Sequence, residues 1–151
     1  MIDGSHDMNL DPEARRMSEA LPIELIASYH AHVYYDPAST REVAGTLRRQ
    51  VSERFSVRLG RWFDQPMGPH GQAMFQIAFR KPLFRTLVPW LMLNRNGLSI
   101  LVHPNSDDQR LDHLQRGLWL GPAVRVFGEH LPPGCLDNDE QDPNTSPSTE
   151  P

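Results

Sequence analysis

The chain has 151 residues, 38% of them hydrophobic, and a formal net charge of -4. This length suits one domain with a buried core, which we expect at residues 23–130 between a disordered leader (1–22) and a disordered acidic, proline-rich tail (131–151). The acidic balance, without a basic stripe, argues against nucleic-acid or membrane-surface binding, and no apolar run reaches the roughly 20 residues of a membrane span. A single cysteine, Cys135, excludes a disulfide framework within the chain and favours the reducing cytoplasm. We therefore expect a cytoplasmic protein that acts on small molecules.

The first predicted strand, residues 23–35, separates apolar side chains from histidines. Its alternation puts small apolar residues on one face and His30, His32 and Tyr34 on the other. A His-x-His pair on a strand presents both imidazoles to the same side, one pleat repeat apart, which suits a shared metal ion. The sequence therefore predicts a metal site on the polar face of a sheet.

A helix and two strands follow in the chain. The helix is predicted to open with a capping box in which Ser39 is the N-cap and Glu42 stands three residues later. Its apolar residues recur every four positions, so one stripe must cover a sheet. Residues 57–63 and 72–80 then alternate as two strands.

A third histidine, His70, lies in the Gly-Pro-His-Gly turn before the third strand. Strand parity places His70 and Gln76 on the same face as the first histidine pair. Gln76 and Tyr34 are candidates to line a substrate pocket, with solvent-facing strand residues as the alternative interpretation.

The second half of the domain adds two further histidines. Residues 82–94 are predicted to form a second helix, and residues 98–103 a fourth strand that ends with His103. A third helix is predicted to begin at Ser106 and to carry His113, which either faces the site or lies exposed on the helix. The apolar segment at 119–126 is expected to add a strand or a dimer contact.

The order of these elements, β-α-β-β-α-β, is typical of the ferredoxin-like plait, an α+β fold. Both helices of this plait cover one face of an antiparallel sheet. We expect the histidine face to be the other, open face. The C-terminal helix and apolar segment are additions to this plan.

Four motifs in this order resemble the small DOPA 4,5-dioxygenase-like proteins. They are Tyr29-His30-Ala31-His32-Val33-Tyr34, Gly68-Pro69-His70, Leu101-Val102-His103-Pro104-Asn105, and Asp112-His113 followed by Leu118-Trp119-Leu120-Gly121. The resemblance spans nearly the whole predicted domain. It implies a ferredoxin-like fold, a divalent metal, and cleavage of a catechol ring, such as that of DOPA, by dioxygen.

Extradiol cleavage needs a ferrous ion with open positions, which a neutral, nitrogen-rich ligand set suits. We expect Fe²⁺, with another divalent metal such as Zn²⁺ as the alternative in the isolated protein. His30 and His32 supply two ligands, and His103 is favoured as the third because the fourth strand of this fold pairs with the first. His70 competes for that place or acts as the general base, and His113 is the other candidate catalytic residue.

Two main functions remain open from the sequence, with a hydrolytic zinc enzyme as a weaker third. The first is a ring-cleaving dioxygenase acting on a small catechol and dioxygen. The second is a non-catalytic plait that binds a metal or small ligand. A homodimer is expected in either case, because an exposed sheet face and the apolar segment at 119–126 offer a surface for a second copy.

Overall fold

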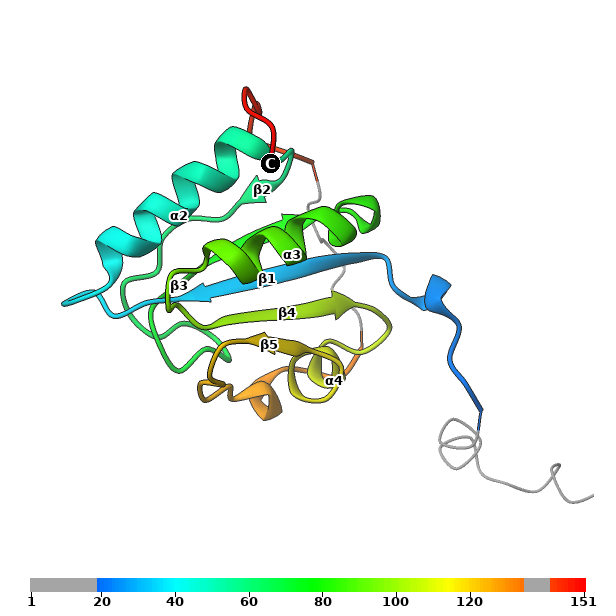
Figure 1. Ribbon diagram of the computed structural model, residues 1–151. Coiled ribbons are helices and arrows are strands. Elements are labelled where there is room, and N and C mark those ends of the chain that lie inside the picture. Colours follow the sequence, from blue (N-terminus) through cyan, green and yellow to red (C-terminus); the bar gives the residue numbers. More distant parts are fainter. Residues whose placement is uncertain (1–18, 135–141) are drawn as a thin grey trace, which may run out of the picture.

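The computed structural model describes residues 19–134 and 142–151 and has an α+β architecture (Figure 1). Five antiparallel strands form one sheet in the order β2-β3-β1-β4-β5. The strands are β1 (Ser28–Tyr34), β2 (Arg58–Leu59), β3 (Met74–Phe79), β4 (Ile100–Asn105) and β5 (Leu118–Leu120). The α-helices are α2 (Arg41–Arg54), α3 (Phe84–Asn94) and α4 (Gln109–Leu114), and short 3-10 turns lie at η2 (Ile23–Leu25), η3 (Lys81–Leu83) and η4 (Gly128–His130). Among the described residues, no helix has the length and apolar character needed to cross a membrane.

Strand β1 lies at the centre of the sheet, and its two faces differ as predicted. Ala31 and Val33 belong to the main hydrophobic core, together with the buried residues of α2 and α3. Tyr34, one residue further on, belongs to a second apolar cluster on the other face. The period-two alternation of side chains along a strand is the cause of this separation.

Helix α2 covers the core face of the sheet through Ala44, Leu47 and Val51, which are buried. It begins at Arg41 with Thr40 as the N-cap residue, so the predicted cap at Ser39 was wrong by one position. The Thr40 hydroxyl instead accepts a hydrogen bond from the backbone amide of Asp36 (2.7 Å). This side chain therefore orders the turn before the helix and does not cap its first amides.

Helix α3 covers the rest of the core face, and Pro89 lies inside it. The helix is followed by Asn96 and Gly97, both with positive φ (47° and 84°), a conformation that ends helices. The predicted helix at 82–94 is thus present with a 3-10 first turn. Strand β2 is much shorter than the predicted strand at 57–63, although Phe63 still makes an isolated bridge to Met74.

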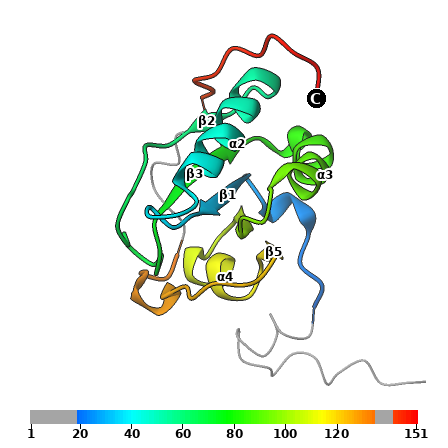
Figure 2. The same cartoon turned by 60° about the vertical axis from the view of Figure 1, so that its left-hand side comes forward.

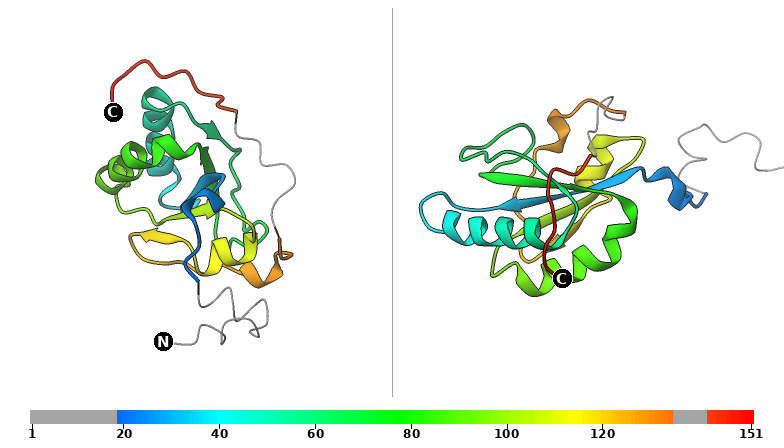
Figure 3. Two further views of the ribbon diagram at one scale, coloured as in Figure 1. Left: turned by 90° about the vertical axis from the view of Figure 1, so that its right-hand side faces the viewer. Right: turned by 90° about the horizontal axis from the view of Figure 1, so that it is seen from above.

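The opposite face of the sheet is covered, which corrects the expectation of an open face. Helix α4 and the segment that follows β5 lie on this side, while α2 and α3 lie on the other (Figures 2 and 3). Strand β5 pairs with β4 and is the strand expected from the apolar segment. The histidine face is therefore an interior layer between the sheet and α4.

Helix α4 begins at Gln109, and its N-cap is Asp108, not Ser106 as predicted. The Asp108 carboxylate accepts hydrogen bonds from the amides of Arg110 (3.0 Å) and Leu111 (3.2 Å). Two residues that can cap lie close together here, and the aspartate satisfies the free amides of the first turn.

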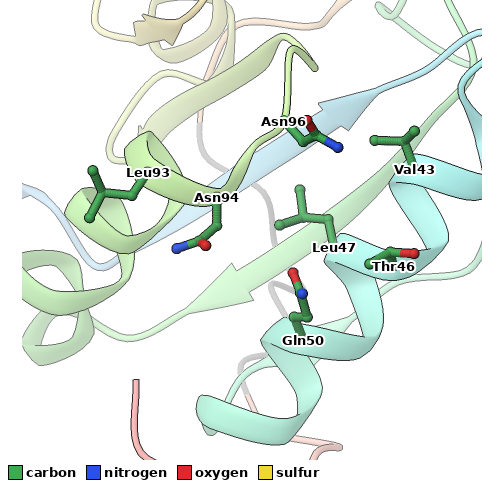
Figure 4. Close-up of a pocket in the computed structure, with 7 residues that line it drawn as sticks. All are labelled: Val43, Thr46, Leu47, Gln50, Leu93, Asn94 and Asn96. Carbon is green, nitrogen blue, oxygen red and sulfur yellow. The ribbon is translucent and has the colours of Figure 1, made fainter.

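A cleft between α2 and α3 lies on the core side of the sheet (Figure 4). Its lining residues are Val43, Thr46, Leu47, Gln50, Leu93, Asn94 and Asn96. Because this lining contains neither a histidine nor a carboxylate, the cleft offers no side chain for acid-base chemistry near neutral pH.

Both predicted disordered ends fall partly on residues outside those described, namely 1–18 and 135–141, which include Cys135. Residues 142–151 are described, and their backbone hydrogen-bonds to the end of α2 and to Val57. The domain boundaries themselves stay predictions.

Candidate metal centre

Five histidines from four parts of the chain meet on the inner face of the sheet. His30 and His32 come from β1, His103 from β4, His70 from the turn before β3, and His113 from α4. His30 lies directly opposite His103 in the antiparallel register, which explains why these two side chains share a face. The first four are 1% to 5% exposed. The site is thus a nearly closed cluster of imidazoles.

His32 is the centre of this cluster. Its ring centroid lies 4.1 Å from that of His70, 5.0 Å from that of His103, 5.7 Å from that of His113 and 5.8 Å from that of His30. His113 in turn packs on His103, with 4.0 Å between ring centroids. Helix α4 therefore does more than border the site, because its histidine lies against the others.

The nitrogens form two groups that could hold a metal ion. In one group, His30, His32 and His103 each offer a ligand atom, and in the other His32, His70 and His113 do so; within each group these atoms lie within 4.8 Å of one another. The first group consists of the three residues predicted as metal ligands. The second contains the two predicted catalytic residues, so the geometry alone leaves two ways to place an ion.

Backbone carbonyls fix the tautomers of two of these histidines. Nδ1 of His103 lies 2.9 Å from the carbonyl oxygen of Pro104, and Nδ1 of His113 lies 2.7 Å from that of Gln109. A carbonyl can only accept, so Nδ1 carries the proton in both rings. In the neutral rings, each Nε2 then keeps a lone pair available to a metal, which is the usual support for a ligating histidine.

The contact between His32 and His103 fits a shared cation. Their Nε2 atoms are 2.9 Å apart, and Nδ1 of His32 is buried without a hydrogen-bond partner. Without an ion, His32 must donate from Nε2 and leave a bare lone pair on Nδ1. Two ligand nitrogens at about 2.1 Å from one ion and at right angles to each other would be about 3.0 Å apart, close to this distance. The donor set therefore fits a divalent metal.

Burial favours the neutral form of four histidines of the cluster. Loss of hydration, reinforced by the neighbouring histidines, lowers the pKa of His32 and of His103 well below the ordinary value of 6.5. The same burial lowers the pKa of His113 and brings the pKa of His70 to about 4. Neutral imidazoles are the metal-binding form, so these rings can ligate an ion at neutral pH without first releasing a proton to solvent.

Tyr34 holds His70. The Tyr34 hydroxyl lies 2.7 Å from Nδ1 of His70, and its ring packs on that of Trp119 with 5.7 Å between centroids. Burial raises the pKa of Tyr34, so the hydroxyl stays protonated at neutral pH. Tyr34, one of the two predicted substrate-binding residues, is therefore hydrogen-bonded to a histidine of the cluster.

Gln76, the other predicted substrate-binding residue, lies directly opposite His32 across β1 and β3. It shares the histidine face and is half-buried. The structure brings it beside the cluster, in agreement with the parity argument.

The segment after β5 fixes the turn that carries His70. The amide of Phe127 donates to the carbonyl of Pro69 (2.6 Å), and the amide of Gly71 donates to the carbonyl of Arg125 (3.3 Å). A Cβ on Gly71 would lie 2.9 Å from that Arg125 oxygen, so only glycine fits this approach. Sequence reasoning missed this role, although the alternating apolar residues of the segment signalled a strand-like partner.

No carboxylate belongs to either histidine group among the described residues. Asp112 is buried beside His113 in sequence, but its carboxylate accepts hydrogen bonds from Ser106 and pairs with Arg116. The arrangement thus differs from a site built of two histidines and one carboxylate.

Comparisons with known proteins identify relatives of this chain. A DOPA 4,5-dioxygenase from Amanita muscaria is 33% identical over 115 residues, which are 71% of this chain and 50% of that protein. An uncharacterized 21.2 kDa protein from Botryotinia fuckeliana is 32% identical over 123 residues, 72% of this chain and 66% of that protein. The chain therefore spans only half to two-thirds of the length of these curated relatives.

A solved structure from Nostoc punctiforme, provisionally described as a dioxygenase, has a TM-score of 0.71 and 50% sequence identity. The match covers 74% of this chain and 96% of that one. The sequence profile of the Dopa 4,5-dioxygenase family matches residues 29–129, a range that includes all five clustered histidines. The chain therefore belongs to the Dopa 4,5-dioxygenase family.

Proposed function

We propose that this protein is a non-haem, Fe²⁺-dependent extradiol dioxygenase that cleaves the ring of a small catechol such as DOPA. The observation that carries the proposal is the cluster of five imidazoles around His32, four of them buried, which offers nitrogen ligands without a carboxylate in either ligand group of the described residues. Family membership and the named activity of the Amanita relative support the reaction type.

In this proposal His30, His32 and His103 hold the metal. Their nitrogens lie close together, and the carbonyl of Pro104 directs Nε2 of His103 toward His32. When bound, the ferrous ion supplies a Lewis-acidic centre at which catecholate and dioxygen meet. Three neutral ligands would leave coordination positions for both reactants.

His70 is proposed as the base that takes a catechol proton. It is neutral at neutral pH because its pKa is about 4, and Tyr34 lies on its Nδ1. The Tyr34 hydroxyl can rotate, so His70 can donate from Nδ1 to the hydroxyl oxygen while Nε2 receives the proton. His113, whose ring centroid lies 5.9 Å from that of His70, is proposed to orient the substrate through its Nε2.

Tyr34 and Gln76 are proposed to border the substrate. Tyr34 contributes an aromatic wall together with Trp119, against which a catechol ring can stack. The half-buried amide of Gln76 offers both a donor and an acceptor to a polar group of the substrate.

For the fold we propose a ferredoxin-like plait made of β1, α2, β2, β3, α3 and β4. The strand order β2-β3-β1-β4 and the position of α2 and α3 on one face support it. Helix α4 and β5 are then additions that close the face bearing the site.

The test is oxygen uptake by protein reconstituted anaerobically with Fe²⁺, assayed against L-DOPA and a panel of simpler catechols. We expect uptake that requires iron and that matches the appearance of a yellow ring-opened product. His70→Gln should bind iron but lose turnover, whereas His130→Gln, at an exposed histidine, should behave like the parent. No uptake with any catechol, despite bound iron, would contradict the proposed reaction.

A further inference from the structure

A second candidate site lies away from the histidines, at the outer edge of the sheet. Strand β2 is the first strand of the sheet and pairs only with β3, so its other side is an edge. Residues 142–149 run along this edge and over the end of α2 (Figure 1). An uncovered edge offers a row of unpaired backbone groups to any extended peptide.

The outward-facing backbone groups of Val57 and Leu59 are all bonded to this segment. The amide of Val57 donates to the hydroxyl of Thr145 (3.0 Å), and its carbonyl accepts from the amide of Asn144 (3.0 Å). The amide of Leu59 donates to the side-chain oxygen of Asn144 (2.8 Å), and its carbonyl accepts from the side-chain nitrogen (2.9 Å). One asparagine side chain thus reproduces the pair of bonds that a neighbouring strand would make.

The same segment caps the end of α2. The carbonyl of Glu53 accepts hydrogen bonds from the amides of Ser148 (2.9 Å) and Thr149 (3.0 Å), and that of Phe55 accepts from the Thr145 hydroxyl (2.6 Å). The last carbonyls of a helix have no partner within the helix, so they are ready acceptors for a passing chain. The surface therefore combines a strand edge with a helix end.

Arginines add charge complementarity at the start of the segment. The guanidinium of Arg58 donates to the carbonyl of Asp142 (3.2 Å), and Arg80 pairs with its carboxylate (3.3 Å). Both ends of the Arg80 pair are exposed, so it contributes little energy. It does favour an acidic residue at this position over a basic one.

We propose that the outer edge of β2, with the end of α2, is a binding surface for an extended peptide, and that residues 142–149 are its intramolecular ligand. Asn144 and Thr145 are the specificity residues. Every strand edge presents backbone groups of the kind that these two residues bond, but the spacing of the groups is particular to this edge. Because residues 142–149 belong to the same chain as the surface, their effective concentration there is high, which favours their binding. A peptide of the same pattern can then replace the segment when the segment is weakened.

The test uses the full chain carrying Asn144→Ala and Thr145→Val, with Ser146→Ala as the matched control at an exposed position of the same segment. In the double variant the amides of Val57 and Leu59 should exchange with deuterium roughly tenfold faster or more, while the control matches the parent. Metal content, measured in parallel, should not change, because the surface lies apart from the histidines.

A labelled synthetic peptide of residues 142–151 is then titrated into each protein. It should bind the double variant with one-to-one stoichiometry and bind the parent much more weakly, and a peptide with the same two substitutions should bind neither. Unchanged exchange in the double variant, or failure of the unsubstituted peptide to bind it, would overturn the proposal. Dimerisation of the double variant without peptide binding would overturn it as well, because the edge would then accept a second sheet edge.

Discussion

Acid should destabilise the metal-free protein through its buried histidines. The pKa of His70 is lowered from 6.5 to about 4 in the folded state by burial, whereas the unfolded chain keeps the ordinary value. Between these two values the unfolded state binds one more proton than the folded state. The stabilisation is therefore fully present above pH 6.5 and is lost as the pH falls toward 4, with a limiting slope of about 1.4 kcal/mol per pH unit for each such histidine.

For His70 alone, linkage gives a loss of about 2.5 kcal/mol between pH 7.5 and 4.5. The assay is urea unfolding at a series of pH values in the presence of a chelator. His70→Gln should remove this share of the pH dependence, and His130→Gln, at an exposed position, should not. If the parent and His70→Gln lost equal stability over this range, His70 would not be buried as a neutral ring and the reasoning would be refuted.

Three further substitutions test the supports of the site. Gly71→Ala would push a Cβ to within 2.9 Å of the Arg125 carbonyl oxygen, so it should shift the His70 turn and reduce turnover, as measured by oxygen uptake, while iron content stays constant. Tyr34→Phe leaves a buried ring nitrogen without its partner, which should cost about 1–3 kcal/mol in urea unfolding and reduce turnover while metal content stays constant. Asp108→Ala removes the cap of α4 and should cost about 1 kcal/mol, and a variant as stable as the parent would show that the cap contributes nothing.

Part of the site could be predicted from the sequence by one short-range rule, the alternation of side chains between the two faces of a strand. Alternation along β1 put His30, His32 and Tyr34 on one face, and the pairing of β1 with β4 brought His103 to them. Each of these steps follows from the geometry of a strand and its neighbour. The same rule placed Gln76 on this face, where the structure has it opposite His32.

The position of His113 depends on how α4 packs across the sheet, and no local pattern fixes that packing. The predictions of the helix N-caps were wrong for a related reason. Ser39 competes with Thr40 one residue away, and Ser106 competes with Asp108 two residues away. Which one caps depends on hydrogen bonds made elsewhere, such as that from Asp36 to Thr40. Tertiary contacts decide between alternatives that are locally equal.

Metal content is the most direct test of the central claim that the histidine cluster holds the catalytic ion. His32 belongs to both possible ligand groups, so His32→Ala removes either one. After anaerobic reconstitution with Fe²⁺ and gel filtration, the parent and His130→Ala should each retain one ion per chain, and His32→Ala should retain none while its circular dichroism shows an intact fold. Equal metal content in His32→Ala and the parent would contradict the account.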